Sequence, residues 1–109
     1  MTSDETSRLP KPDLKRPSGV INTETRERFS FSNNRITIGR ANDNNLCLEQ
    51  DIYVSGHHAQ IYLERQDCFI RDLGSANGTL VNNLVISSPV KISIGDTITI
   101  GRAKLELVE

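Results

Sequence analysis

Short alternating runs of apolar and polar residues dominate the chain from about residue 18 onward. In segments such as 98–100 and 105–107, apolar and polar residues take turns, which places one face on a core and the other in water. No segment has the sustained spacing of an amphipathic helix. The pattern predicts about eleven short strands, at 19–23, 27–31, 35–38, 45–48, 58–64, 68–73, 79–81, 84–86, 90–92, 97–100 and 103–108.

Residues suited to tight turns separate many of these runs. They tolerate positive φ or form local side-chain hydrogen bonds, and they occur at Asn33-Asn34, Gln66-Asp67, Asn82-Asn83 and Gly95-Asp96. Antiparallel hairpins follow from this placement. Eleven strands in about ninety residues exceed what one open twisted sheet holds, so the fold class we expect is all-β, a two-sheet β-sandwich with mostly antiparallel strands.

The first 17 residues differ from the rest of the chain in composition and patterning. They contain Pro10, Pro12 and Pro17, which are three of the four prolines, together with charges of both signs and no apolar periodicity. Such a segment cannot bury enough apolar surface to fold alone. We therefore expect a disordered tail at 1–17 and one folded domain at 18–109.

Composition narrows the functional classes. The chain has 109 residues, with 14 acidic and 13 basic side chains and a formal net charge of -1. It lacks the positive field that attracts nucleic acid or anionic lipid, and no apolar run approaches the roughly 20 residues of a membrane span. The polar N-terminus does not resemble a secretory signal. A cytoplasmic protein without nucleic acid or membrane partners is expected.

Catalysis and metal binding have little support in the composition. A domain of this size buries one modest core and leaves little room for a deep substrate cavity, which favours binding over catalysis. The two cysteines, Cys47 and Cys68, lie in strand-like segments and are expected to be reduced. They suggest no metal site, and no cofactor is predicted.

Four loop features carry the candidate chemistry, namely Gly39-Arg40, Ser55-Gly56-His57-His58, residues 74–79 (Gly-Ser-Ala-Asn-Gly-Thr), and Gly95-Asp96. Each is common in proteins when it occurs alone. In this order and spacing, on an all-β pattern, they resemble the forkhead-associated (FHA) domain, a family of phosphothreonine-binding β-sandwiches. The resemblance extends from Arg35 to about Val108.

A phosphothreonine carries about -1.5 to -2 charges and three acceptor oxygens. A domain that binds it therefore needs a guanidinium and a neutral hydroxyl. Arg40 and Ser55 can supply these groups, and the amide of Asn77 can pair with the backbone of an extended peptide. The resemblance implies the same roles. An isolated Gly-Arg pair is more often an ordinary solvated arginine and an isolated Asn-Gly pair a simple turn, so these assignments depend on the combination of motifs.

Other site residues are expected to act structurally. The resemblance implies that His58 forms hydrogen bonds within the site and holds the Ser55 loop in shape. Gly39 and Gly78 are expected to serve the backbone conformation, since glycine permits sharp turns.

The chain also departs from the family pattern. Gly56 stands where the family commonly has a basic or amide residue, and Ala76 stands where many members have Thr or Ser. The backbone amide of Gly56 and the ring of His57 are candidates to replace the missing phosphate contacts. The segment before Ser55 is about one residue longer than the family pattern and contains Ile52-Tyr53.

The motifs are relevant to three classes of function. The leading one is a phosphothreonine-dependent peptide-binding module in Ser/Thr kinase signalling. The alternative is a phosphorylation-independent interaction or assembly domain of the same fold. A hydrolase using Ser55 and His58 is disfavoured, because on an extended strand these residues lie about 10 Å apart unless a turn closes the gap, and no third carboxylate is indicated.

The tail contains a candidate phosphoacceptor, Thr6, with Leu9 three residues later. The family often reads the third residue after the phosphothreonine. Thr6 lies twelve positions before Ser18, which allows a reach of up to roughly 40 Å against a domain radius of gyration near 13 Å. Phosphorylated Thr6 is therefore a possible ligand for its own domain, favoured by high effective concentration. A disordered leader with incidental threonines is the alternative.

Overall fold

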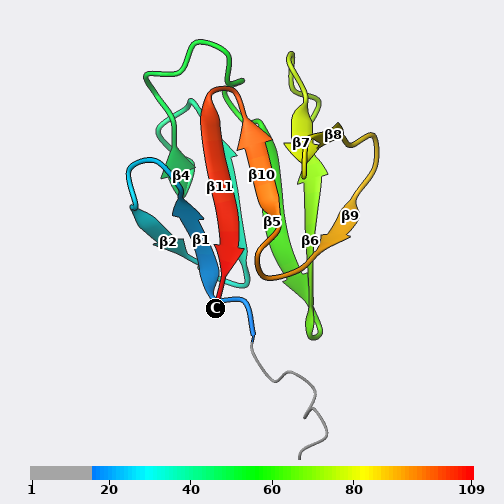
Figure 1. Ribbon diagram of the computed structural model, residues 1–109. Coiled ribbons are helices and arrows are strands. Elements are labelled where there is room, and N and C mark those ends of the chain that lie inside the picture. Colours follow the sequence, from blue (N-terminus) through cyan, green and yellow to red (C-terminus); the bar gives the residue numbers. More distant parts are fainter. Residues whose placement is uncertain (1–15) are drawn as a thin grey trace, which may run out of the picture.

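The computed structural model describes residues 16–109, which form two β-sheets packed face to face (Figure 1). The strands in chain order are β1 (Gly19–Asn22), β2 (Arg28–Ser30), β3 (Arg35–Gly39), β4 (Leu46–Cys47), β5 (Ala59–Glu64), β6 (Asp67–Asp72), β7 (Thr79–Val81), β8 (Leu84–Val85), β9 (Val90–Ile92), β10 (Thr97–Ile100) and β11 (Ala103–Val108). The predicted tail and Thr6 lie outside the described residues, apart from residues 16 and 17.

One sheet has six strands in the order β2-β1-β11-β10-β7-β8, and the other has five in the order β4-β3-β5-β6-β9. The strand pairs are antiparallel except for the parallel pair of β3 and β4. The predicted two-sheet, mostly antiparallel sandwich is confirmed. No helix long and apolar enough to cross a bilayer occurs in residues 16–109.

The core lies between the sheets and follows the alternation of the sequence. In β3, Ile36 and Ile38 are fully buried while Arg35 is exposed, because successive side chains of a strand point to opposite faces. Ile98 and Ile100 of β10 and Leu105 and Leu107 of β11 supply the facing layer. This core holds the strand ends, and therefore the loops between them, in fixed positions.

Two of the predicted hairpin turns have the expected backbone. Asn33 and Asn34 have φ values of 55° and 63°, and Asn82 and Asn83 have 50° and 70°. Positive φ at both central residues is the requirement of the two-residue turn that matches strand twist.

The turn predicted at Gln66-Asp67 is wrong by one residue. Glu64 pairs with Asp67, so the turn consists of residues 65 and 66, and Arg65 has a φ of 61°. The cause is register, since Ile61 must face Ile70 for both to enter the core, and this pairing determines where the hairpin closes.

Both cysteines are free thiols. Cys47 lies in β4 and Cys68 in β6, and two strands separate them in the five-stranded sheet. Three strand spacings amount to about 14 Å, which is too far for a disulfide. Burial raises the pKa of Cys68 to about 12, whereas Cys47 is only partly buried.

We expect an aromatic disulfide reagent at pH 8 to label Cys47 in the folded protein and to spare Cys68. The thiolate is the reactive form, and a pKa of about 12 leaves almost none of it at Cys68. Mass spectrometry of the labelled protein before and after unfolding in urea measures the difference. Equal labelling of the two thiols in the folded state would contradict this account.

Candidate functional site

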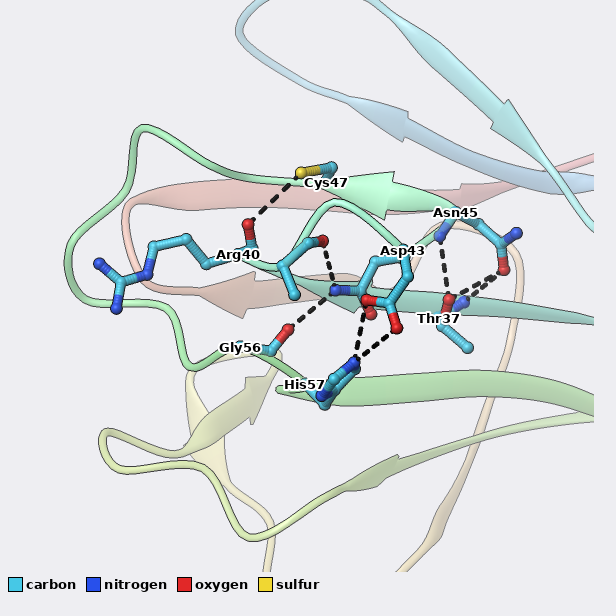
Figure 2. Close-up of polar contacts among 9 residues, drawn as sticks. Thr37, Arg40, Asp43, Asn45, Cys47, Gly56 and His57 are labelled. Carbon is cyan, nitrogen blue, oxygen red and sulfur yellow. Dashed lines mark hydrogen bonds and ion pairs between the residues drawn. The ribbon is translucent and has the colours of Figure 1, made fainter.

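Two loops at one end of the sandwich place Arg40 beside Ser55. The backbone N–H of Arg40 donates to the carbonyl of Ser55 at 2.9 Å, and that of Ala41 donates to the carbonyl of Gly56 at 3.1 Å. These bonds continue the contact between the chain segments beyond the ends of β3 and β5. The guanidinium of Arg40 extends away from the strands (Figure 2), so its charge is directed outward next to the Ser55 loop.

The loop between β6 and β7 completes the cluster. Its Ala76 N–H donates to the hydroxyl oxygen of Ser55 at 2.9 Å, and the Asn77 amide donates to the carbonyl of Tyr53 at 2.9 Å. Arg40 and Asn77 are exposed and Ser55 is partly so. The structure therefore brings together the three residues predicted to contact a phosphopeptide, with the hydroxyl proton of Ser55 and the carbonyl oxygen of Asn77 available for a ligand.

His58 is buried at the centre of these loops, with none of its surface exposed. Its Nδ1 accepts the N–H of Ser55 at 3.0 Å, and its Nε2 lies 2.8 Å from the carbonyl of Gly78. This pair of contacts assigns the proton to Nε2, because the carbonyl can only accept. The ring thus ties the Ser55 loop to the Asn77 loop.

A turn brings His58 close to Ser55, as the sequence left open. Residues 56 and 57 are bends and β5 begins at Ala59, one residue later than predicted, so the ring of His58 reaches back to the backbone of Ser55. The serine hydroxyl takes part in a different contact, with Ala76. Both ring nitrogens of His58 are engaged elsewhere, which leaves the ring unsuited to act as a base for this hydroxyl.

His57 lies on the surface and contacts a carboxylate. Its Nε2 is 3.0 Å and 3.1 Å from the two carboxylate oxygens of Asp43 (Figure 2). The hydrogen bond from His57 lowers the pKa of Asp43. A phosphate contact by His57 would require its ring to exchange this partner.

The family model for the FHA domain matches residues 36–101 of this chain. That match covers more than half of the sequence. The chain belongs to the FHA domain family. FHA domains are binding modules, and the loop cluster just described occupies one end of this one.

Relatives of this FHA domain occur in mycobacteria. The chain is 35% identical over 83 residues to the FHA domain-containing protein FhaB of Mycobacterium tuberculosis, an alignment covering 76% of this chain and 53% of FhaB. It is 36% identical over 78 residues to the glycogen accumulation regulator GarA of the same species, covering 72% of this chain and 47% of GarA. The chain thus spans about half the length of these curated relatives.

Solved structures share the fold. Mycobacterium tuberculosis EmbR in complex with a low-affinity phosphopeptide superposes with a TM-score of 0.80 at 28% identity, covering 85% of this chain and 24% of EmbR. An FHA domain from a structural and functional analysis of phosphothreonine-dependent FHA domain interactions superposes with a TM-score of 0.75 at 26% identity. That alignment covers 83% of this chain and 93% of the other.

Asn44 is a site residue of this FHA domain that the sequence did not reveal. Its buried side-chain amide donates to the carbonyl of Ala41 at 2.7 Å and to that of Gly56 at 2.8 Å, so it joins the Arg40 loop to the Ser55 loop. The polar run 42–45 offers four similar candidates, and only the contact with Gly56, 12 residues away, distinguishes Asn44.

Replacing Asn44 with alanine is expected to lower the free energy of unfolding by about 1–3 kcal/mol, because two carbonyls at a partly buried loop junction each lose one of their two hydrogen-bond donors. The exposed neighbour Asn42 provides a matched control, and Asn42→Ala is expected to change stability by less than about 0.5 kcal/mol. Urea unfolding followed by circular dichroism measures both variants. Equal losses of stability in the two variants would contradict the role of Asn44 in connecting the Arg40 loop to the Ser55 loop.

Asp72 organises the loop that carries Asn77. Its carboxylate accepts hydrogen bonds from the Ser75 hydroxyl at 2.6 Å, the Thr79 hydroxyl at 2.7 Å, and the N–H groups of Gly74 and Ser75, each at 2.9 Å. Burial raises the pKa of Asp72, but these bonds outweigh it and the net pKa is lowered. An Asp at a strand end, with Gly and Ser two and three residues later, is a local turn signal that could have identified it.

Two glycines at the loop cluster are required for different reasons. A Cβ on Gly39, the last residue of β3, would lie 2.1 Å from the carbonyl oxygen of Gly56, a clash with the backbone of the Ser55 loop. Gly78 has a φ of 88°, which other residues rarely adopt. Gly56 itself has room, since its nearest neighbour would be the Cβ of Ala41 at 4.0 Å.

The longer loop before Ser55 forms an exposed apolar surface beside the cluster. Ile52 is 69% exposed and Tyr53 is 46% exposed. One carboxylate oxygen of Asp51 accepts the N–H of Tyr53 at 3.0 Å, and the other accepts the N–H of Arg102 at 2.7 Å. The Arg102 guanidinium lies 5.0 Å from the centre of the Tyr53 ring. The loop is thus fixed against the β10–β11 turn.

Proposed function

We propose that this FHA domain binds phosphothreonine-containing peptides or proteins in Ser/Thr kinase signalling. The observation that carries the proposal is the meeting of Arg40, Ser55 and Asn77 at one end of the sandwich, through hydrogen bonds between three loops. Such an arrangement offers a phosphate the positive charge of Arg40, on a backbone held in place by hydrogen bonds, and several donors before the ligand arrives.

In this proposal Arg40 and Ser55 bind the phosphate. The guanidinium forms charge-assisted, fork-like hydrogen bonds, and the serine hydroxyl donates its proton to a phosphate oxygen while its own oxygen accepts from Ala76. The amide of Gly56 is a further donor toward the phosphate, and the ring of His57 becomes one when it exchanges its contact with Asp43. Asn77 aligns the peptide backbone, and Gly39, His58 and Gly78 hold the loops.

Neighbouring surfaces select the residues that flank the phosphothreonine. Ile52 and Tyr53 offer an apolar surface two to three residues before Ser55, which favours apolar flanking side chains. We propose a binding role without catalysis, in the cytoplasm, where protein kinases act.

The relatives support this assignment. EmbR was solved with a phosphopeptide, and the FHA domain with a TM-score of 0.75 comes from work on phosphothreonine-dependent interactions. Gly56 and Ala76 remove two side-chain contacts of the family pattern, which is the basis of the phosphorylation-independent alternative. The geometry of Arg40, Ser55 and Asn77 favours phosphate-dependent binding.

Titration of matched phosphothreonine, phosphoserine and unmodified peptides by fluorescence anisotropy tests the proposal. We expect the phosphothreonine peptide to bind, the phosphoserine peptide to bind about fivefold more weakly because one methyl group stays unburied, and the unmodified peptide not to bind. Equal binding of phosphorylated and unmodified peptides would favour the phosphorylation-independent alternative.

The tail prediction has its own test. Thr6 phosphorylated by a kinase or by chemical synthesis is expected to occupy the loop cluster of its own domain and so to weaken the apparent affinity for an added phosphothreonine peptide about tenfold or more. The same measurement on Thr6→Ala protein is the control. Unchanged affinity after phosphorylation would leave the tail without this regulatory role.

A further inference from the structure

Strand β8 presents two aliphatic side chains to solvent at an edge of the six-stranded sheet. Leu84 is 72% exposed and Val85 is 69% exposed. Exposed sheet edges are usually protected by charged residues or proline bulges. Residues 73–90 contain no charged side chain, although 25% of the chain is charged. This edge is therefore suited to an uncharged, apolar segment of another polypeptide.

A hollow of about 420 Å³ opens beside β8. Its apolar walls are Val81, Leu84, Val85, Ile86 and Val90, and Lys91 and Asp96 lie at its charged border. It lies where the chain leaves β8 and loops back to β9 at the edge of the other sheet (Figure 1). We call this hollow, together with the exposed surfaces of Leu84 and Val85, the β8 groove. Its apolar walls offer aliphatic side chains a surface to pack on.

The backbone of β8 is oriented to pair with a further strand. Ile86 donates its N–H to the carbonyl of Thr79 at 3.0 Å, and Val85 lies opposite Leu80. Bonded and non-bonded pairs alternate along an antiparallel ladder, so Val85 directs its N–H and C=O away from β7. A strand added at this edge would meet one donor and one acceptor, with Val85 on one face and Leu84 on the other.

The β8 groove is continuous with the loop cluster. A Cβ placed on Gly78, the residue after Asn77, would lie 3.8 Å from Cγ1 of Val85. Val85 is opposite Leu80, which is three residues beyond Asn77, or about 10 Å along the strand. An extended peptide held at Asn77 can therefore reach β8 about three residues later.

We propose that the phosphothreonine ligand continues past Asn77 and that an uncharged aliphatic segment, about four to six residues from the phosphothreonine, pairs with the free edge of β8 and packs on Leu84 and Val85. This inference rests on the proposed function. Two aliphatic side chains and a short strand cover far less than the roughly 800 Å² that each partner of a standard interface buries, which favours a short segment over a folded partner or a second copy.

Degenerate peptide pools with a fixed phosphothreonine test this proposal without a known ligand. A short pool has two residues on each side, and long pools carry Val-Leu-Val or Ser-Ser-Ser at positions four to six, either before or after the phosphothreonine. In anisotropy titrations we expect Val-Leu-Val on one side to bind about tenfold more tightly than Ser-Ser-Ser. The double substitution Leu84→Ser and Val85→Thr removes this gain and leaves the affinity of the short pool unchanged.

Ile94→Ser provides the matched control, because Ile94 is also exposed and lies in the β9–β10 turn outside the β8 groove; it is expected to keep the gain. The amide resonance of Val85 should shift with the long apolar pool and not with the short one. The proposal is overturned by equal affinities of the long pools, by a gain that survives the double substitution, or by dimerisation that the double substitution abolishes. If even the short pool does not bind, the proposed function fails as well.

Discussion

Replacing Arg40 with alanine is expected to weaken phosphothreonine-peptide binding by about 100-fold or more. The guanidinium is the only side-chain cation in the cluster of Arg40, Ser55 and Asn77, and its fork geometry matches phosphate oxygens. Truncating one partner of a hydrogen-bonded charge pair costs about 2–5 kcal/mol, which corresponds to a loss of about 30-fold to several thousand-fold. Isothermal titration with one phosphothreonine peptide measures the change.

Two controls separate loss of the contact from loss of the fold. Arg40 is exposed, so Arg40→Ala should leave the urea midpoint nearly unchanged. Arg65→Ala removes an exposed arginine from the β5–β6 turn and should leave affinity unchanged. Arg40→Lys keeps the charge without the fork and should bind with intermediate affinity. Full affinity of Arg40→Ala would exclude Arg40 from the phosphate site.

Replacing Gly39 with alanine is expected to lower the free energy of unfolding by about 2–4 kcal/mol. The added methyl carbon would lie 2.1 Å from the carbonyl oxygen of Gly56 and 2.8 Å from the amide nitrogen of Asn44. Relief of this clash would separate the Arg40 loop from the Ser55 loop and break the hydrogen bond from Asn44 to Gly56. Urea unfolding measures the loss, and phosphopeptide affinity should fall with it.

Gly56→Ala is the matched control for the same junction. Its methyl group would lie 4.0 Å from the Cβ of Ala41, an ordinary contact, so stability should change by less than about 0.5 kcal/mol. If the Gly39 and Gly56 variants unfold at the same urea concentration, the close approach of the two loops is not a source of stability.

The sandwich could be predicted from the sequence because the alternation of apolar and polar residues within a strand shows which of its two faces is buried. Alternation in Ile98-Thr99-Ile100 identifies both the strand and its buried face, and the same alternation of burial is seen in β6 and β11. The local sequence predicts the ends of the strands less well. The turn near Gln66 depends on the pairing of Ile61 with Ile70 across the ladder, which no local pattern contains.

In the loop cluster, the sequence predicts only those residues whose chemical type suits few roles. Arg40, Ser55 and Asn77 were named from motifs, and the structure places them together. Asn44 was missed because its role comes from burial against Gly56. Its neighbours in the run 42–45 are polar residues of similar type, so the sequence does not distinguish it from them. The contact between Ser55 and His58 depends on the bend at residues 56 and 57, which the sequence left open as an alternative to an extended strand.

The loop before Ser55 can tolerate sequence change without unfolding the domain. Residues 49–53 lie between Leu48, which packs against the core, and Val54, which is 1% exposed. Closing a longer loop between such fixed points costs little extra free energy. The exposed side chain of Ile52 can therefore change at little cost to the fold, provided that the Tyr53 carbonyl still accepts the hydrogen bond from Asn77. In the proposed binding function, new partner preferences can thus arise in a domain that is already stable.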